Sequence, residues 1–237
     1  MKKGFLIAID GPVASGKGTI AKSLSLSIHA VNLNSGGMYR AYALKLLRKK
    51  VGFDSVAEIV STLKSGQVEI AINPENLESF QIILEKEDVT DTLFDPEISN
   101  AASLFGKHRE FVEFINGELR RVAKYYGDMG LGIIMEGRQI GVNVFPDADV
   151  KIFLTASILI RSQRRLEQYK VKGIHKTLEE VVEETETRDM QDMEREFGAL
   201  PRYPEKLGYE VVDDSHLTED QTLEKILGIL RKEGIYN

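Results

Sequence analysis

A glycine-rich loop near the N-terminus constrains this chain more than any other feature. Residues 5–9 form the continuous apolar run FLIAI, and the sequence GPVASGKGT follows at residues 11–19. An unbroken apolar run is typical of a strand that is buried on both faces of a parallel sheet. The glycines let the loop turn its N–H groups toward a phosphate chain, and the helix that follows adds a favourable dipole. Strand, loop and helix in this order predict a nucleotide phosphate site in an α/β fold.

The loop is expected to hold the phosphates of a nucleoside triphosphate through its backbone and through Lys17. The residues concerned are Gly11, Pro12, Val13, Ala14, Ser15, Gly16, Lys17, Gly18 and Thr19. Because Gly18 follows the lysine, the hydroxyl that often binds Mg²⁺ in such loops is missing, and Thr19 is expected to face the phosphates instead. We therefore expect Mg²⁺ to be held mainly by nucleotide oxygens and water.

The rest of the chain alternates between strand and helix patterns. Further buried strands are predicted at residues 30–33, 131–135, 150–154 and 210–212, and helices at residues 38–50, from 99 to about 126, and from 177 to about 197. Thr177 with Glu180, and Thr218 with Gln221, form capping boxes, the second for a last helix through Lys232. Strands separated by helices imply a three-layer α/β fold, with a parallel sheet and helices on both faces. The strand order cannot be read from local pattern.

Residues 66–97 have a different character. Val68, Ile70 and Ile72 alternate with other residues, residues 80–84 form another β-prone run, and residues 73–76 supply turn chemistry between them. We predict a small antiparallel insertion within the α/β chain.

Composition limits the classes of protein that remain. The chain has 237 residues, which suits one large domain, and a net charge of −6, which argues against binding nucleic acid generally. It has no cysteine, which excludes disulfides and thiolate metal sites. No run is long enough to span a membrane, and the basic, apolar N-terminus ends too soon for a signal peptide. We expect a cytoplasmic protein without a membrane partner.

Arginines at motif-like positions are the candidate ligands for a second phosphate group. Arg40 closes the segment NSGGMYR, and Arg138 follows the end of a predicted strand, where ligand crevices form in open α/β sheets. Arg188, Asp192 and Arg195 are spaced to share one helical face. A solvated helix with an ordinary ion pair explains the spacing of Arg188 and Asp192 about equally well.

One carboxylate and four histidines complete the candidates. Glu136 ends the predicted strand at residues 131–135 and is best placed to organise Mg²⁺ through water, although a capping or salt-bridge role is the alternative. The four histidines show no metal-ligand spacing, so no direct metal ligand is certain.

Together these segments resemble the bacterial cytidylate kinases, which are nucleoside monophosphate kinases of the P-loop class, over nearly the whole chain. The segments that carry the resemblance are residues 9–19, 34–40, 100–103, 136–156 and 188–195. The resemblance implies one kinase domain with a core (about 1–35, 100–170 and 200–237), a monophosphate-binding insertion (about 36–99) that contains the antiparallel segment, and a helical lid (about 171–199). It also implies ATP as phosphoryl donor, Mg²⁺, and small nucleotides as the only partners; we expect a monomer.

The resemblance assigns roles by position. The catalytic residues would be Lys17, Arg138, Arg188 and Arg195; ATP would also contact Arg161; and the acceptor would contact Ser35, Arg40, Ser103, Arg109, Arg138, Gln139, Arg188, Asp192 and Arg195. Asp192 would contact the sugar and Ser103 the base. The expected reaction is phosphorylation of CMP and dCMP by ATP.

Several positions depart from the family pattern. The family usually has aspartate where this chain has Asn34 and Gln139. It also usually has an arginine on the helix after Ser103; this chain has Val112 at that position, and Arg109 lies about one turn away. That arginine and the carboxylate help to read cytosine in the family, whereas a glutamine amide can both donate and accept. A preference for UMP is therefore one alternative. A nucleotide-binding protein with degraded catalysis is another.

Overall fold

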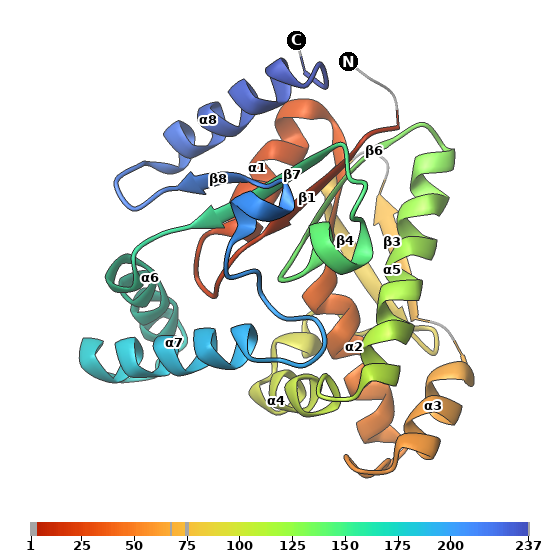
Figure 1. Cartoon of the computed structure of the whole chain (residues 1–237). Helices are drawn as coiled ribbons and strands as arrows, with labels where there is room; N and C mark the ends of the chain where they lie inside the picture. Colours follow the sequence, from red (N-terminus) through yellow and green to blue (C-terminus); the bar gives the residue numbers. More distant parts are fainter. Residues whose placement is uncertain (1–3, 67, 74–75, 237) are drawn as a thin grey trace.

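The computed structural model describes residues 4–66, 68–73 and 76–236. Five parallel strands form its main sheet, in the order β2-β6-β1-β7-β8 (Figure 1). Their bounds are β1 Leu6–Asp10, β2 Ala30–Asn34, β6 Gly132–Gly137, β7 Val150–Thr155 and β8 Glu210–Asp213. All five predicted strands are present, within one or two residues of the expected bounds.

Helices cover both faces of this sheet, as the alternating pattern predicted. Ile7 and Ile9 of β1 are fully buried against one side, where α1 (Lys17–Ile28) and α8 (Glu219–Lys232) lie. Ala8, between them, belongs to the cluster on the other side, where α2 (Ser35–Arg48), α4 (Pro96–Phe105) and α5 (Arg109–Asp128) pack. Because successive strand residues point to opposite faces, a continuous apolar strand is what this three-layer α/β arrangement requires.

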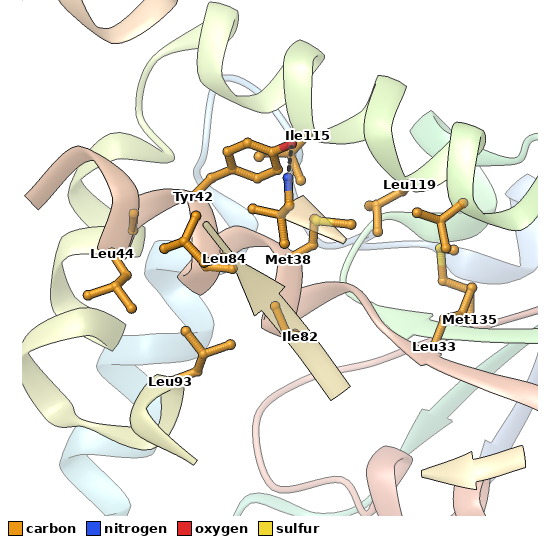
Figure 2. Packing of buried hydrophobic residues seen from close by; sticks show 14 of the residues in the cluster. Leu33, Met38, Tyr42, Leu44, Ile82, Leu84, Leu93, Ile115, Leu119 and Met135 are labelled. Atoms are coloured by element: carbon orange, nitrogen blue, oxygen red, sulfur yellow. Dashed lines mark hydrogen bonds between the residues drawn. The ribbon is translucent and has the colours of Figure 1, made fainter. Parts of the chain in front are cut away.

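The larger cluster joins the main sheet to a second, smaller sheet. Figure 2 shows Met38 and Tyr42 of α2 packed among residues of α5 and of β4. The Tyr42 hydroxyl also accepts a hydrogen bond from the N–H of Val68, at 3.1 Å. This packing fixes the small sheet on α2, the helix that carries Arg40.

The small sheet is antiparallel, as predicted, with the order β3-β4-β5. Its strands are β3 Val68–Asn73, β4 Asn76–Leu84 and β5 Glu87–Asp88, and the 3₁₀ turn η1 Thr92–Phe94 follows. Two residues of the predicted turn, 74 and 75, lie outside the described residues. Helix α3 (Val56–Lys64), which we did not predict, precedes the sheet and buries Ile59 and Leu63.

Several helix bounds differ from the predictions for local reasons. Helix α2 begins at Ser35, three residues early, because the Asn34 side chain caps it by accepting from the N–H of Gly37. The predicted helix from 99 to 126 is two helices, α4 and α5. After β6, the chain forms only a single π turn, η2 Ile140–Val144.

The C-terminal part carries two helices that project from the sheet, α6 Ile158–Val171 and α7 Leu178–Met193 (Figure 1). Both predicted capping boxes are present, at Thr177 and Thr218. Helix α7 ends four residues before the predicted position 197, and the 3₁₀ turn η3 Pro204–Leu207 leads to β8. Among the described residues, no helix combines the length and the apolar character that crossing a membrane requires.

Candidate active site

A cleft of about 630 Å³ opens at the carboxyl ends of β1, β2 and β6. Its lining comes from the glycine loop, from the starts of α2 and η2, and from α4, α5, α6 and α7. The predicted site residues that line it are Val13, Ala14, Ser15, Gly16, Lys17, Gly18, Thr19, Ser35, Arg40, Ser103, Glu136, Arg138, Gln139, Arg188 and Arg195. One cleft thus brings together the phosphate loop and the arginines that the sequence placed far apart.

The glycine loop has the backbone that close phosphate contact requires. Gly16 caps α1 in the left-handed region, with φ +84°. A Cβ at Gly11 would lie 2.0 Å from the carbonyl oxygen of Leu154, so only glycine fits there. Gly11 and Pro12 do not line the cleft; Gly11 lies against Leu154 of β7, and the Pro12 carbonyl oxygen accepts from Lys17.

Lys17 is buried within the loop. Its Nζ donates to the carbonyl oxygen of Pro12 at 2.7 Å and to Ser15 Oγ at 3.2 Å. Burial, reinforced by the charge of Arg138, lowers the pKa of Lys17 to about 7. A phosphate group beside the lysine would reverse this shift, because an anion favours the charged form.

Three arginines of the cleft surround one buried carboxylate. Asp192, whose side chain is 1% exposed, lies 2.9 Å from Arg138 Nε, 3.4 Å from Arg188 Nε and 2.9 Å from Arg195 Nη2. Burial alone would raise the pKa of Asp192, but the three positive charges outweigh it and hold that pKa below its usual range. Asp192 therefore gathers three cations at one point of the cleft, and the alternative of a solvated helix face does not hold.

Arg40 and Ser35, at the start of α2, extend this positive region. The Arg40 Nε is buried and has no hydrogen-bond partner among the described residues. Ser35 Oγ donates to the carbonyl oxygen of Glu136 at 2.7 Å, which ties α2 to the end of β6. A buried guanidinium nitrogen without a partner is costly unless an anion accepts from it, so this position suits a phosphate group.

Glu136 lies beside Gly18, the position at which similar loops often have a hydroxyl side chain. A Cβ at Gly18 would lie 3.3 Å from Glu136 Oε1. The same oxygen accepts from Asn34 Nδ2 at 2.7 Å. No group of three or more acidic, histidine or cysteine side chains suitable for a metal occurs among the described residues. One carboxylate next to a phosphate loop fits Mg²⁺ that is also bound by nucleotide oxygens and water.

One group of residues that line the cleft is uncharged and mostly polar. Ser103 of α4 and Gln139 belong to it, together with Val112, Asn116 and Tyr39. Gln139 Nε2 donates to the Tyr39 hydroxyl at 2.9 Å. The sequence analysis missed Tyr39 and Asn116, although Tyr39 adjoins Arg40 and Asn116 is a polar residue within an apolar helical face.

Besides Gly11 and Pro12, three predicted residues do not line the cleft: Asp192, which is paired with three lining arginines, Arg161 and Arg109. Arg161 is buried in an ion pair with Asp189, at 2.6 Å, and its Nη1 donates to the Val13 carbonyl oxygen at 3.2 Å. It supports the loop from behind, whereas Arg165, one turn further along α6, lines the cleft. Arg109 is exposed, paired with Glu113 at 2.6 Å and placed 5.6 Å from the ring centre of Phe197; unlike Val112 and Phe197, it does not line the cleft.

Other residues that the sequence analysis missed shape the walls. Phe197 and Gly198, after α7, reach back to the cleft, and a Cβ at Gly198 would lie 2.8 Å from Gln139 Nε2. Because the chain must turn back to place Phe197 and Gly198 at the cleft, α7 ends at Met193. The buried Asp10 accepts from the N–H groups of Ile140 and Gly141, at 2.9 and 2.8 Å, and so fixes the turn that presents Gln139.

Comparison with known proteins agrees with this geometry. The family model described as cytidylate kinase matches residues 7–232. A cytidylate kinase of Bacillus licheniformis is 35% identical over 234 residues, and the alignment covers 99% of each chain. A cytidylate kinase of Bacillus thuringiensis is 34% identical over 231 residues, with 97% of each chain covered.

A solved structure of an uncharacterized protein from Eubacterium ventriosum covers 97% of this chain and 99% of that one, with a TM-score of 0.54 and 13% identity. That likeness supports the fold alone. The match of the family model over almost the entire chain, with relatives that align from end to end, shows that this chain belongs to the cytidylate kinase family of nucleoside monophosphate kinases.

Proposed function

We propose that the chain transfers the γ-phosphoryl group of ATP to CMP and dCMP. The observation that carries this proposal is the convergence of Lys17 with Arg138, Arg188 and Arg195 in one cleft. Joining two polyanions requires positive charge on both sides of the transferred group, and positioning and electrostatics supply nearly all of the catalysis.

The two ends of the cleft suit two nucleotides. Phosphates of ATP would lie along the loop N–H groups and Lys17, and the acceptor phosphate would lie against Arg40 and Arg138. An oxygen of the acceptor phosphate then attacks the γ-phosphorus in line, and the bond from that phosphorus to the β-phosphate oxygen breaks. Lys17 and the arginines neutralise the charge on the transferred group.

Mg²⁺ would be held by Glu136, directly or through water, with the nucleotide phosphates supplying the other oxygens. When bound, it would neutralise the developing charge between the β- and γ-phosphates. Asn34 keeps the Glu136 carboxylate turned toward Gly18 through its hydrogen bond.

The division into a core, a monophosphate-binding insertion and a lid is part of this proposal. Residues 171–199 would close over the nucleotides and exclude water, so that ATP is not simply hydrolysed. The ion pair between Arg161 and Asp189 supports it, because it connects α7 to the loop that holds ATP. A monomeric state and a cytoplasmic location stay predictions.

The alternative of a nucleotide-binding protein without efficient transfer is less well supported. Every cation that transfer needs lines the cleft. Asn34 bonds Glu136 beside the glycine loop, and the substitutions at Val112 and Gln139 lie among the residues proposed to bind the acceptor. These substitutions bear on which base is accepted, not on whether a phosphoryl group moves.

A steady-state assay with MgATP and a panel of CMP, dCMP, UMP and AMP tests the proposal. We expect turnover with CMP and dCMP and formation of the corresponding diphosphates. ATP hydrolysis without any nucleoside diphosphate product would contradict phosphoryl transfer to a monophosphate. Turnover of AMP alone would contradict the pyrimidine assignment.

A further inference from the structure

We propose that a relay of four uncharged side chains, Asn116, Tyr39, Gln139 and Asn143, reads the acceptor base in either hydrogen-bond direction, so that the chain takes UMP as well as CMP. This inference rests on the proposed kinase function and names the base selectivity of the same site.

The relay is continuous. Asn143 Nδ2 donates to Gln139 Oε1 at 2.8 Å, and Gln139 Nε2 donates to the Tyr39 hydroxyl at 2.9 Å and to Asn116 Oδ1 at 3.4 Å. The Tyr39 hydroxyl also donates to Asn116 Oδ1, at 3.3 Å. Three of the four, all but Asn143, line the cleft.

The relay leaves one amide group for a ligand. Asn116 Oδ1 already accepts from two donors, and Asn116 Nδ2 makes no hydrogen bond within the described part of the chain. The residue as a whole is only 6% exposed, and it lines the cleft, so this amide nitrogen is open to a ligand there. With the hydrogen bonds running as observed, Asn116 Nδ2 is the group that can donate to the base.

Every member of the relay can both donate and accept. Amides can exchange their oxygen and nitrogen positions by rotation, and a phenol hydroxyl turns to suit its neighbours. Burial raises the pKa of Tyr39, which keeps its hydroxyl protonated and able to act in both senses. At the far end, Asn143 is exposed, so its amide can rotate in water. The whole chain of bonds can therefore reverse without leaving a buried group unpaired.

In the part of the chain that the structure describes, no acidic side chain that lines the cleft hydrogen-bonds to the relay; Glu113 and Glu196 lie in the adjoining pocket, which Asn116, Gln139 and Asn143 also line. Glu136 is the one carboxylate among the described residues that line the cleft, and it lies at the glycine loop. A carboxylate only accepts, so it would favour the 4-amino group of cytosine and repel the 4-oxygen of uracil. Sites that bind a substrate group by hydrogen bonds reject analogues strongly because buried groups would be left unpaired. A reversible relay removes that penalty for either base.

The test measures kcat/KM for CMP and UMP at saturating MgATP. For the wild type we expect the two values to lie within about tenfold of one another. Gln139→Glu and Asn116→Asp each place a carboxylate in the relay, and the ratio of CMP to UMP should rise at least about tenfold. Gln163→Glu, which adds the same charge at an exposed position of α6, should leave the ratio unchanged.

A pH series separates base reading from a merely structural role. In Gln139→Glu, protonation of the new carboxyl restores a donor, so the ratio should fall back toward the wild-type value at low pH. The wild-type ratio should stay flat, because no relay member titrates there.

A wild-type ratio above about one hundred, or ratios in both variants equal to that of Gln163→Glu, would overturn the relay while leaving CMP phosphorylation intact. Absence of product with every pyrimidine monophosphate would instead overturn the kinase proposal itself.

Discussion

The two ends of the cleft are lined by different groups: a contiguous backbone loop at one end, and side chains from several elements at the other. At the proposed donor end, the lining is a contiguous backbone loop, residues 13–19, which leads into α1 (Figure 1). At the acceptor end, side chains from α2, α4, α5 and η2 must meet. A backbone site tolerates little change, whereas a site made of side chains can change its ligand by single substitutions. Two departures from the family pattern, Val112 and Gln139, lie among the side chains proposed to bind the acceptor, whereas Asn34 bonds Glu136 beside the loop.

Replacing Lys17 with methionine should have the largest effect, because it removes the charge nearest the transferred group. We expect kcat/KM to fall at least about 10³-fold with every acceptor. The fold should be retained, because burial already disfavours the charged lysine. Steady-state kinetics and thermal unfolding check both statements.

Lys225→Met, at an exposed position of α8, is the matched control and should be neutral. A loss of less than tenfold in Lys17→Met would mean that the donor end does not depend on this side chain.

Asp192→Asn should come second, because one carboxylate holds three arginines in place. We expect kcat/KM for the acceptor to fall about 10²-fold. The arginines are partly exposed, so water screens their repulsion and the free energy of unfolding should drop by only about 1–2 kcal/mol. Asp147→Asn, at an exposed position, serves as the control. An unchanged KM and kcat would show that the cluster is only structural.

The sequence predicted the glycine loop that lines one part of the cleft, and only some of the side chains that line the rest. The glycine loop is contiguous, so spacing alone identifies it. The contact of Tyr39 with Asn116 spans 77 positions and that with Gln139 spans 100, and no local pattern reports such pairs. The same limit applies to Arg161 and Arg109, because helical phase does not say which side of a helix faces the cleft. All five strands were predictable from their apolar residues, although β2 includes Asn32 and β7 includes Lys151, but their order was not.

Gly198→Ala should weaken the acceptor end alone. The residue has φ +72°, and a Cβ would lie 2.8 Å from the Gln139 amide. We expect kcat/KM for the acceptor to fall about tenfold and stability to drop by about 1 kcal/mol, with the KM for ATP unchanged. Gly228→Ala on α8, where nothing lies within 4 Å, should be neutral or slightly stabilising. Equal kinetics for the two variants would argue against contact between the Gly198 segment and the acceptor pocket.

The smallest predicted effect is the uptake of protons when ATP binds. Because the pKa of Lys17 is lowered to about 7, the lysine of the free protein is mostly neutral at pH 8. Nucleotide phosphates favour the charged form, so ATP binding should take up close to one proton at pH 8 and almost none at pH 6. Calorimetry in buffers of different ionisation enthalpy measures this uptake. The Lys17→Met variant should show none, and uptake that is equal at both pH values would contradict the assignment.

The most direct test of two nucleotide sites in one cleft is the binding of adenosine and cytidine joined by five phosphates. This account predicts one molecule bound per chain, more tightly than ATP or CMP alone, because linking the two ligands makes the second contact intramolecular. It also predicts competition with both nucleotides, and weaker binding after Lys17→Met and after Arg40→Met. Competition with ATP alone, with no effect of Arg40→Met, would contradict the placement of the acceptor in this cleft.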